Sequence, residues 1–331
     1  MIDAHILTRR TAYLFALTFL LIFASGCKNQ AVSSDSNAAN SNHTAAPKDT
    51  GFDARRAYTH VEKVVGFGPR PSGSVAIKKT QDYIIGELTS YGLKISEDNF
   101  TAQTPKGTMP MRNIIAELPG QKPEVVIISG HYDTKIMPNF VGANDAGSST
   151  GALLETARVL AKSKPEYTLW FVFFDGEEAV VEWQGTDNTY GSRHFVQKRK
   201  ADGSLKNIKA MINYDMIGDK GLDLRRDGNS TKWLVDLLWK TALQMGYNKH
   251  FLGNDTYMSD DHMHFVEAGI AAVDLIDFNF GANNSYWHTT QDTLDKVSGE
   301  SMKVVADVVI TALPEIFKQL DNKATGAAAQ K

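Results

Sequence analysis

Apolar residues recur along this chain in two patterns, one typical of buried strands and one typical of amphipathic helices. The unbroken apolar run at 169–174 predicts a strand that is buried on both faces. Apolar segments of strand length also occur at 95–102, 111–118, 124–130, 209–214 and 271–276. Apolar residues at helical spacing predict helices near 52–65, 77–91, 151–162, 232–245 and 304–320.

The order of these segments predicts the fold class. Strands that alternate with helices indicate an α/β protein, in which a mostly parallel, twisted central sheet is covered by helices on both faces. We therefore expect a three-layer sandwich. The segments at 95–102 and 111–118 flank a turn at 103–107, so the chain is expected to begin its sheet with a hairpin-like pair.

The two ends of the chain differ from this pattern. Arg9 and Arg10 precede a short apolar run, and residues 24–27 read Ala-Ser-Gly-Cys. This resembles a bacterial lipoprotein signal with cleavage before Cys27 and lipid on its sulfur; an ordinary signal peptide or a membrane anchor are the alternatives. Each of these readings exports the protein, and a lipid would anchor it to a bacterial membrane, facing the periplasm or the exterior. We predict a signal peptide with the lipidated cysteine at 1–27, a disordered tether at 28–51, one folded domain at 52–322, and a disordered tail at 323–331.

Composition narrows the function classes. The chain has 331 residues, of which 42% are hydrophobic, enough for one large domain. The formal net charge is −3, and no basic stripe suggests a nucleic-acid partner. Cys27 is the one cysteine, so the domain must be held together without a disulfide.

The strongest chemical signal follows the apolar run at 169–174. Asp175, Glu177 and Glu178 come directly after it, and Gly176 allows a sharp turn between them. Carboxylates at the end of a buried strand repel one another and lose hydration, and a divalent metal is the usual compensation. Of two adjacent glutamates, one can bind metal while the other moves protons. A solvated acidic turn is the alternative for such a pair alone.

Further acidic and histidine side chains follow the other predicted strands. His131 and Asp133 end one strand, and their spacing on an extended backbone points both to the same side. Asp145 precedes a predicted helix; taken alone it indicates an N-cap, and together with the glutamate pair it becomes a candidate metal ligand. The remaining groups of this kind are Asp215, Asp260 and His288. Sites in open α/β sheets lie at the carboxyl ends of strands, and two carboxylates with one imidazole make a suitable set for a single zinc ion.

Several stretches together resemble peptidase family M28, and in detail its branch of animal-type glutaminyl-peptide cyclotransferases. The resemblance runs from about residue 58 to residue 320. It rests on the segments at 103–107, 113–115, 131–135, 140–145, 173–179, 183–194, 260–262 and 287–289. The segment around Trp183 and the Asp-Asp-His at 260–262 are specific to the branch, whereas His-x-Asp and Glu-Glu belong to the whole group. The resemblance implies a zinc-aminopeptidase-like fold.

Carried over to this sequence, the resemblance also implies roles for individual residues. Zinc is assigned to Asp145, Glu178 and His288, and proton transfer to Glu177. The remaining assignments are a carboxylate network of Asp215 and Asp260, and a substrate pocket formed by Trp183, Trp287 and Phe280. The loop at 277–286 is longer than in the animal relatives, so the substrate range is left open.

The resulting expectation is a zinc-dependent glutaminyl-peptide cyclotransferase that acts on the N-termini of peptides or proteins. One zinc ion is expected. The alternative is an M28 aminopeptidase, in which His131 and Asp215 would bind a second zinc ion bridged by Asp145. A third reading is a catalytically idle protein that binds peptide N-termini, but such a protein has no need of the proton carrier Glu177.

Overall fold

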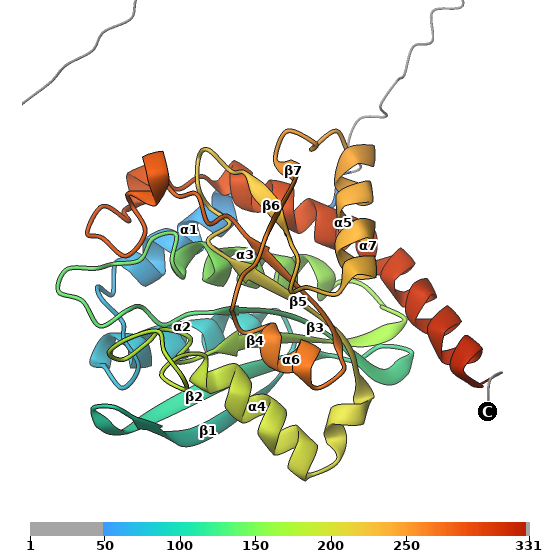
Figure 1. Ribbon diagram of the computed structural model, residues 1–331, viewed down its shortest axis with the longest axis horizontal. Helices are drawn as coiled ribbons and strands as arrows, with labels where there is room; N and C mark the ends of the chain where they lie inside the picture. The colour runs from blue at the N-terminus through green and yellow to red at the C-terminus, as the bar shows by residue number, and fades with distance from the viewer. Residues whose placement is uncertain (1–48, 329–331) are drawn as a thin grey trace, which may run out of the picture. The chain divides into compact units, whose positions relative to one another are not determined.

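The computed structural model describes residues 49–328, and its centre is a six-stranded mixed sheet (Figure 1). The expected signal peptide, Cys27 and the tether up to residue 48 lie outside the described residues. The strand order is β1-β2-β4-β3-β5-β8; β1 pairs antiparallel with β2, and β2 antiparallel with β4, while the other neighbours are parallel. The strands are β1 (Lys94–Thr104), β2 (Gly107–Leu118), β3 (Lys122–His131), β4 (Tyr167–Phe174), β5 (Ile208–Asp215) and β8 (Ala271–Ile276).

Helices cover both faces of this sheet, which confirms the predicted α/β sandwich. The larger apolar core lies between the sheet and the helices α1 (Ala54–Val65), α2 (Val75–Ser90), α3 (Gly147–Leu160), α5 (Lys232–Gln244) and α7 (Gly299–Ala328). The smaller core, on the opposite face, is closed by α4 (Tyr190–Ala201) and α6 (Met263–Glu267). Short 3₁₀ helices lie at Ser204–Asn207, Ala282–Asn284 and Leu294–Lys296.

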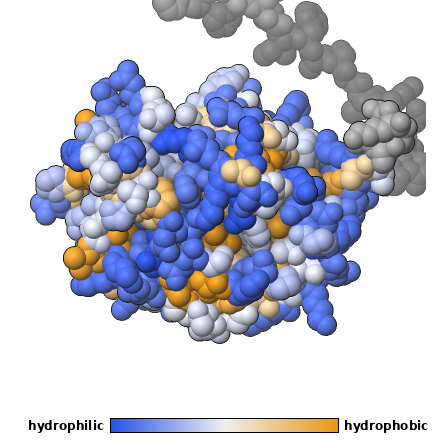
Figure 2. Space-filling view, turned by 90° about the horizontal axis from the view of Figure 1, so that it is seen from below, coloured by the Kyte–Doolittle hydropathy of each residue, from blue (hydrophilic) through white to orange (hydrophobic). Residues whose placement is uncertain are grey.

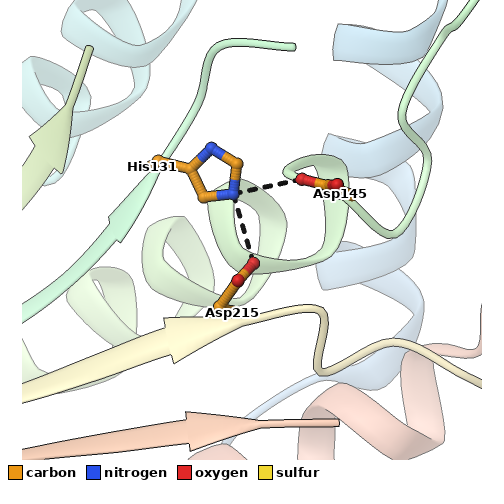
Figure 3. Close-up of side chains that lie close together, drawn as sticks. All are labelled: His131, Asp145 and Asp215. Atoms are coloured by element: carbon orange, nitrogen blue, oxygen red, sulfur yellow. Dashed lines mark hydrogen bonds and ion pairs between the residues drawn. The ribbon is translucent and has the colours of Figure 1, made fainter. Parts of the chain in front are cut away.

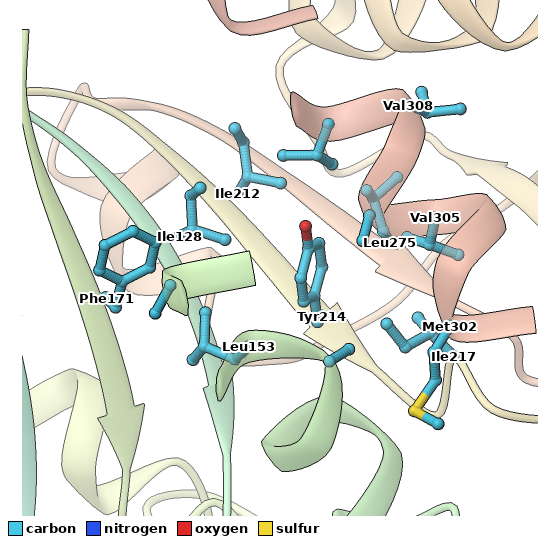
Figure 4. Packing of buried hydrophobic residues seen from close by; sticks show 14 of the residues in the cluster. Ile128, Leu153, Phe171, Ile212, Tyr214, Ile217, Leu275, Met302, Val305 and Val308 are labelled. Atoms are coloured by element: carbon cyan, nitrogen blue, oxygen red, sulfur yellow. The ribbon is translucent and has the colours of Figure 1, made fainter. Parts of the chain in front are cut away.

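The larger core shows why the apolar patterns predicted the elements so closely. In Figure 4, Ile128 and Ile212 of adjacent strands lie on the side of the cluster that holds Leu153 of α3, and Met302 and Val305 of α7 lie on its other side. All five side chains are fully buried. Each such side chain contributes roughly 1.5–3 kcal/mol relative to an exposed one, so the layers are held mainly by apolar burial.

Other expectations from the sequence need correction. Residues 323–328 continue α7 and are not a disordered tail, because alanine-rich sequence favours helix. The folded domain also begins earlier than residue 52: the Thr50 hydroxyl donates to Asp307, and the Gly51 carbonyl accepts from Arg158 Nη2 at 3.0 Å.

Four further elements have no counterpart in the sequence analysis. These are α4, α6, and the strands β6 (Leu224–Asp227) and β7 (Phe251–Thr256), which form a separate two-stranded parallel sheet. The helix α4 ends in a basic segment, and its apolar side is short, since its larger buried side chains are Tyr190, Phe195 and Val196. Its sequence therefore carries little helical periodicity.

The surface seen from below is largely hydrophilic, with apolar side chains in small groups (Figure 2). Among residues 49–328, we find no helix that combines the length and the apolar character needed to cross a bilayer.

Candidate active site

The site lies at the edge of the sheet where its topology reverses. From β3 the chain passes through α3 to β4 on one side, and β5 then pairs with the opposite side of β3. Ligand sites in open α/β sheets form at such a switch point, outside the carboxyl ends of the strands. His131 ends β3, Asp215 ends β5, and the Glu177–Glu178 pair follows β4. The predicted convergence of these strand ends is present in the structure.

Asp145, Glu178 and His288 form one compact group of candidate metal ligands, each offering an atom within 4.8 Å of the others. His288 Nε2 lies 3.1 Å from Glu178 Oε1 and 3.3 Å from Asp145 Oδ2. Glu178 Oε2 is buried without a hydrogen-bond partner in the described part of the chain, with Lys135 Nζ at 3.6 Å. Two carboxylates, one of them with an unpartnered buried oxygen, and an imidazole fit a zinc ion.

A second group shares Asp145 with the first. His131 Nε2 lies 3.2 Å from Asp215 Oδ1 and 3.3 Å from Asp145 Oδ1 (Figure 3). These three residues also meet the criterion of mutually close ligand atoms. The structure therefore places His131 where the alternative with a second metal requires it.

Asp145 is not the N-cap of α3. Ala146 takes that position, and no side chain caps this helix. The Asp145 carboxylate instead faces the two histidines. Burial alone would raise the pKa of Asp145, but the hydrogen bonds with His131 and His288 lower it below its ordinary value.

The Glu177–Glu178 turn is held by Asp133. Its Oδ1 accepts the N–H of Glu177 at 3.1 Å, and its Oδ2 accepts the N–H of Glu178 at 3.3 Å. Gly176 has a φ of +72°, and a Cβ at this position would lie 2.6 Å from Met111 Sδ. The positive φ therefore favours glycine in the turn that we predicted. Asp133 also lies 3.5 Å from His131 Nδ1, as its spacing indicated.

The carboxylates around Glu177 raise one another's pKa values. Burial raises the pKa of Glu177 well above its ordinary range; His131 opposes this shift, and Asp260, Glu178 and Asp215 add to it. Burial, and then the charge of Asp215, raise the pKa of Asp260 to about 7. Burial also raises the pKa of Asp215, while the hydrogen bond with His131 and the charge of His131 oppose this shift. The arrangement can therefore store and return a proton near neutral pH.

These groups open into a cavity of about 500 Å³ with aromatic walls. Trp183 and Trp287 both line it, so neither is an ordinary core residue. The Trp287 ring stacks on the His288 ring with centroids 3.9 Å apart. Phe278 meets Trp287 edge to face at 4.7 Å and completes this side of the wall.

Phe280, which we expected to contact substrate, does not line the cavity. It is fully buried with Met216 and Ile276 beneath the site, and its backbone N–H donates to Asn284 Oδ1 at 3.0 Å. Phe278, which is 39% exposed, takes the predicted place. Sequence alone offered no basis for choosing between two phenylalanines in one irregular loop.

Other residues of the cavity were also missed. Lys135 is the lysine among the lining residues, and it lies in the 131–135 motif without having been assigned a role. Val181 and Met258 supply further apolar surface. Their positions in loops carry no periodic signal by which they could have been found.

The family model described as Peptidase family M28 matches residues 113–313 of this chain. The chain belongs to peptidase family M28. This match includes all three members of the Asp145–Glu178–His288 group, and it confirms the resemblance found in the sequence.

Among similar proteins, a glutaminyl-peptide cyclotransferase of Drosophila melanogaster is 29% identical over 252 residues, covering 68% of this chain and 70% of that protein. The solved structure of an Acidobacteriales bacterium glutaminyl cyclase is 37% identical with a TM-score of 0.77, covering 87% of this chain and all of that chain (100%). A Zn-dependent exopeptidase from Parabacteroides distasonis is 26% identical with a TM-score of 0.72, covering 81% of this chain and 99% of that chain. The M28 fold of this chain is therefore shared with glutaminyl cyclases and with an exopeptidase.

Proposed function

We propose that the chain is a zinc-dependent glutaminyl-peptide cyclotransferase, which converts an N-terminal glutamine into pyroglutamate and releases ammonia. The observation that carries this proposal is that Glu177 lies beside the Asp145–Glu178–His288 group in one cavity walled by Trp183 and Trp287. The similarity to glutaminyl cyclases supports the same reaction.

The cavity suits the N-terminal residue of a peptide. Its volume falls in the range typical of small-ligand sites, and its lining combines apolar and aromatic side chains with several carboxylates. Trp183 and Trp287 would exclude water from the glutamine side chain and orient it. Carboxylates outnumber Lys135 and His288 among the lining residues, and their oxygens can accept hydrogen bonds from the α-amino group of the peptide.

Asp145, Glu178 and His288 would hold the zinc ion, which when bound polarises the side-chain carbonyl of the glutamine. Glu177 takes a proton from the α-amino group as its nitrogen bonds to the carbon of the side-chain amide. Glu177 then returns that proton to the amide nitrogen, the carbon–nitrogen bond breaks, and ammonia leaves. Asp215 and Asp260 keep Glu177 partly protonated through charge repulsion and hydrogen bonding. Because both reacting groups belong to one residue, holding them in contact supplies much of the rate.

One experiment separates the reactions open to this site. The purified protein is incubated with peptides that begin with Gln and with peptides that begin with Leu, and the products are followed by mass spectrometry. Loss of ammonia from the Gln peptides is the expected result. Release of the N-terminal residue from the Leu peptides, with no loss of ammonia, would contradict the proposal.

An aminopeptidase is the second candidate, and the His131–Asp145–Asp215 group is the observation that favours it. His131, Asp145 and Asp215 would then hold a second zinc ion, and Glu177 would activate a water molecule. Zinc content after dialysis distinguishes the two candidates. We expect one tightly held zinc ion per chain; two would favour the peptidase.

We also infer that the protein is exported and anchored by lipid on Cys27. The basic residues Arg9 and Arg10, the apolar run after them and the small residues before Cys27 support this inference. The substrates would then be peptides or proteins outside the cytoplasm.

A further inference from the structure

Asp292 is a fully buried carboxylate that accepts hydrogen bonds from the backbone of the candidate ligand Asp145 and of the residue before it. Its Oδ1 accepts the N–H of Asn144 at 2.7 Å, and its Oδ2 accepts the N–H of Asp145 at 3.0 Å. The Asp292 carbonyl oxygen also accepts the N–H of Ala143 at 3.4 Å. Three successive N–H groups of the Asp145 loop therefore depend on this one residue.

The same residue lies in the turn that carries His288. The Asp292 N–H donates to the Thr289 carbonyl at 3.1 Å, and the Thr289 N–H donates to the Tyr286 carbonyl at 3.3 Å. His288 itself has a φ of +51°, which non-glycine residues rarely adopt. Such a conformation persists only where the surroundings determine it strongly. Asp292 thus joins the loops of two ligands that are far apart in sequence.

The opposite side of the Asp145 loop is held by Arg70, which is fully buried. Its Nη1 donates to the Val141 carbonyl at 2.6 Å, and its Nη2 donates to the Gly142 carbonyl at 2.9 Å. A Cβ on Gly142 would lie 1.9 Å from the Asp145 carbonyl oxygen, so the loop is packed tightly on itself. Arg70 thus binds the loop at residues 141 and 142, and Asp292 binds it at the three residues that follow.

We propose that Asp292 is a positioning residue that couples the Asp145 and His288 loops and thereby sets the affinity of the Asp145–Glu178–His288 group for zinc. This inference rests on the metal site of the proposed function. Asp292 does not line the cavity, so it acts through the ligands and not on substrate. Its two carboxylate oxygens match two N–H donors, whereas an asparagine amide would present its own NH₂ group to one of them.

The test compares Asp292→Asn with Asp295→Asn. Asp295 lies three positions further along the same segment with a side chain that is 66% exposed, so its variant removes the same charge without touching the Asp145 loop. Zinc dissociation constants are measured by chelator competition on the folded, zinc-free proteins. Loss of a partner that orients a metal ligand typically weakens binding about 10–100-fold, and we expect this for Asp292→Asn with no change for Asp295→Asn.

Turnover at saturating zinc provides the readout that a general loss of structure would not reproduce. We expect Asp292→Asn to recover most of the wild-type kcat once zinc is in excess, because Glu177 and the cavity are unchanged. Unaltered zinc affinity in folded Asp292→Asn, or an equal loss in Asp295→Asn, would overturn the inference. A wild-type protein that binds no zinc would overturn the proposed metal site as well, so the two failures are distinguishable.

Amide hydrogen exchange in the zinc-free wild-type protein keeps the inference testable if Asp292→Asn fails to fold. We expect the N–H groups of Asn144 and Asp145 to be strongly protected, because a buried carboxylate holds both. Exchange at the rate of an open loop would show that Asp292 does not fasten this segment.

Discussion

His288 Nε2 lies 3.1 Å from Glu178 Oε1, although 110 positions separate the two residues in the chain. Asp145 completes the group from a third loop, 3.3 Å from the same nitrogen. Two carboxylates from separate parts of the chain thus lie around one histidine. A divalent cation stabilises such an arrangement. The predictions below test what each member of this site does.

Glu177 and Glu178 are adjacent and chemically identical, so only their positions can give them different roles. Glu178→Gln removes a charged oxygen from the candidate metal group, and we expect it to lower both zinc content and thermal stability. The measurement is metal analysis of the purified variant beside its melting temperature. Wild-type zinc content in this variant would show that Glu178 is not a ligand.

Glu177→Gln is the matched variant and should retain zinc. An amide cannot accept and return a proton, and acid–base groups typically contribute about 10²–10⁴-fold to the rate, so we expect kcat to fall by that factor. Peptide binding should change little. The measurement is steady-state kinetics with a Gln peptide; turnover near the wild-type value would refute the assigned role.

Phe278 and Phe280 offer a second matched pair, because one lines the cavity and the other is buried below it. Phe280→Ala should lower the free energy of unfolding by about 3–5 kcal/mol, as large-to-small changes at buried phenylalanines do. Phe278→Ala should leave stability nearly unchanged and raise the KM for Gln peptides by up to about tenfold through lost apolar contact. Urea unfolding and kinetics of both variants test this, and the reverse pattern would restore the substrate contact to Phe280.

Asp277 predicts a dependence of stability on pH that does not involve the metal ligands. Burial, with the nearby charges of Asp223 and Asp219, raises the pKa of this carboxyl to about 7, although the backbone N–H groups of Asp223 and Asn279 oppose the shift. The pKa of Asp277 is higher in the folded state than in the unfolded state, so protonation of Asp277 favours folding. Its contribution to the free energy of unfolding is complete below the unfolded pKa. That contribution is lost as the pH rises through about 7.

Asp277→Asn has no such titration. From pH 5 to pH 8, the free energy of unfolding of the variant should therefore rise by about 1–3 kcal/mol relative to that of the wild type. Urea unfolding at both pH values measures the difference. Asp295→Asn serves as the control, since hydrogen bonds with Lys296 and Thr293 lower the pKa of Asp295 to about 2, outside this window. A difference that stays constant between the two pH values would contradict the raised pKa.

Cys27→Ser tests the proposed lipid anchor. The change removes the sulfur that would carry lipid, so we expect the protein to be released from the membrane or to remain unprocessed. Membrane fractionation and the mass of the mature N-terminus provide the measurement. Wild-type protein found entirely in the cytoplasm would contradict both export and anchoring.

The strands of the sheet and the location of the site could be predicted from the sequence alone. Apolar runs such as 169–174 predicted strands buried on both faces, and the acidic residues directly after them predicted where the site lies. This works because parallel strands bring their carboxyl ends to one edge of the sheet, so a residue's place after a strand already gives its approximate location. Asp145, Glu178 and His288 were named on that basis together with the family resemblance, and the structure places them within contact of one another.

The choice between similar residues in irregular segments was decided by tertiary structure. Phe278 lines the cavity while Phe280 is buried, and Asp145 faces two histidines instead of capping α3. Asp133 accepts the backbone N–H of Glu177, and Asp292 accepts that of Asp145. Hydrogen bonds of this kind have no signature in the sequence. Periodicity reports which side of a regular element is buried, but a loop side chain is placed by contacts with segments that are distant in the chain. Those contacts exist only after the sheet has brought the loops together.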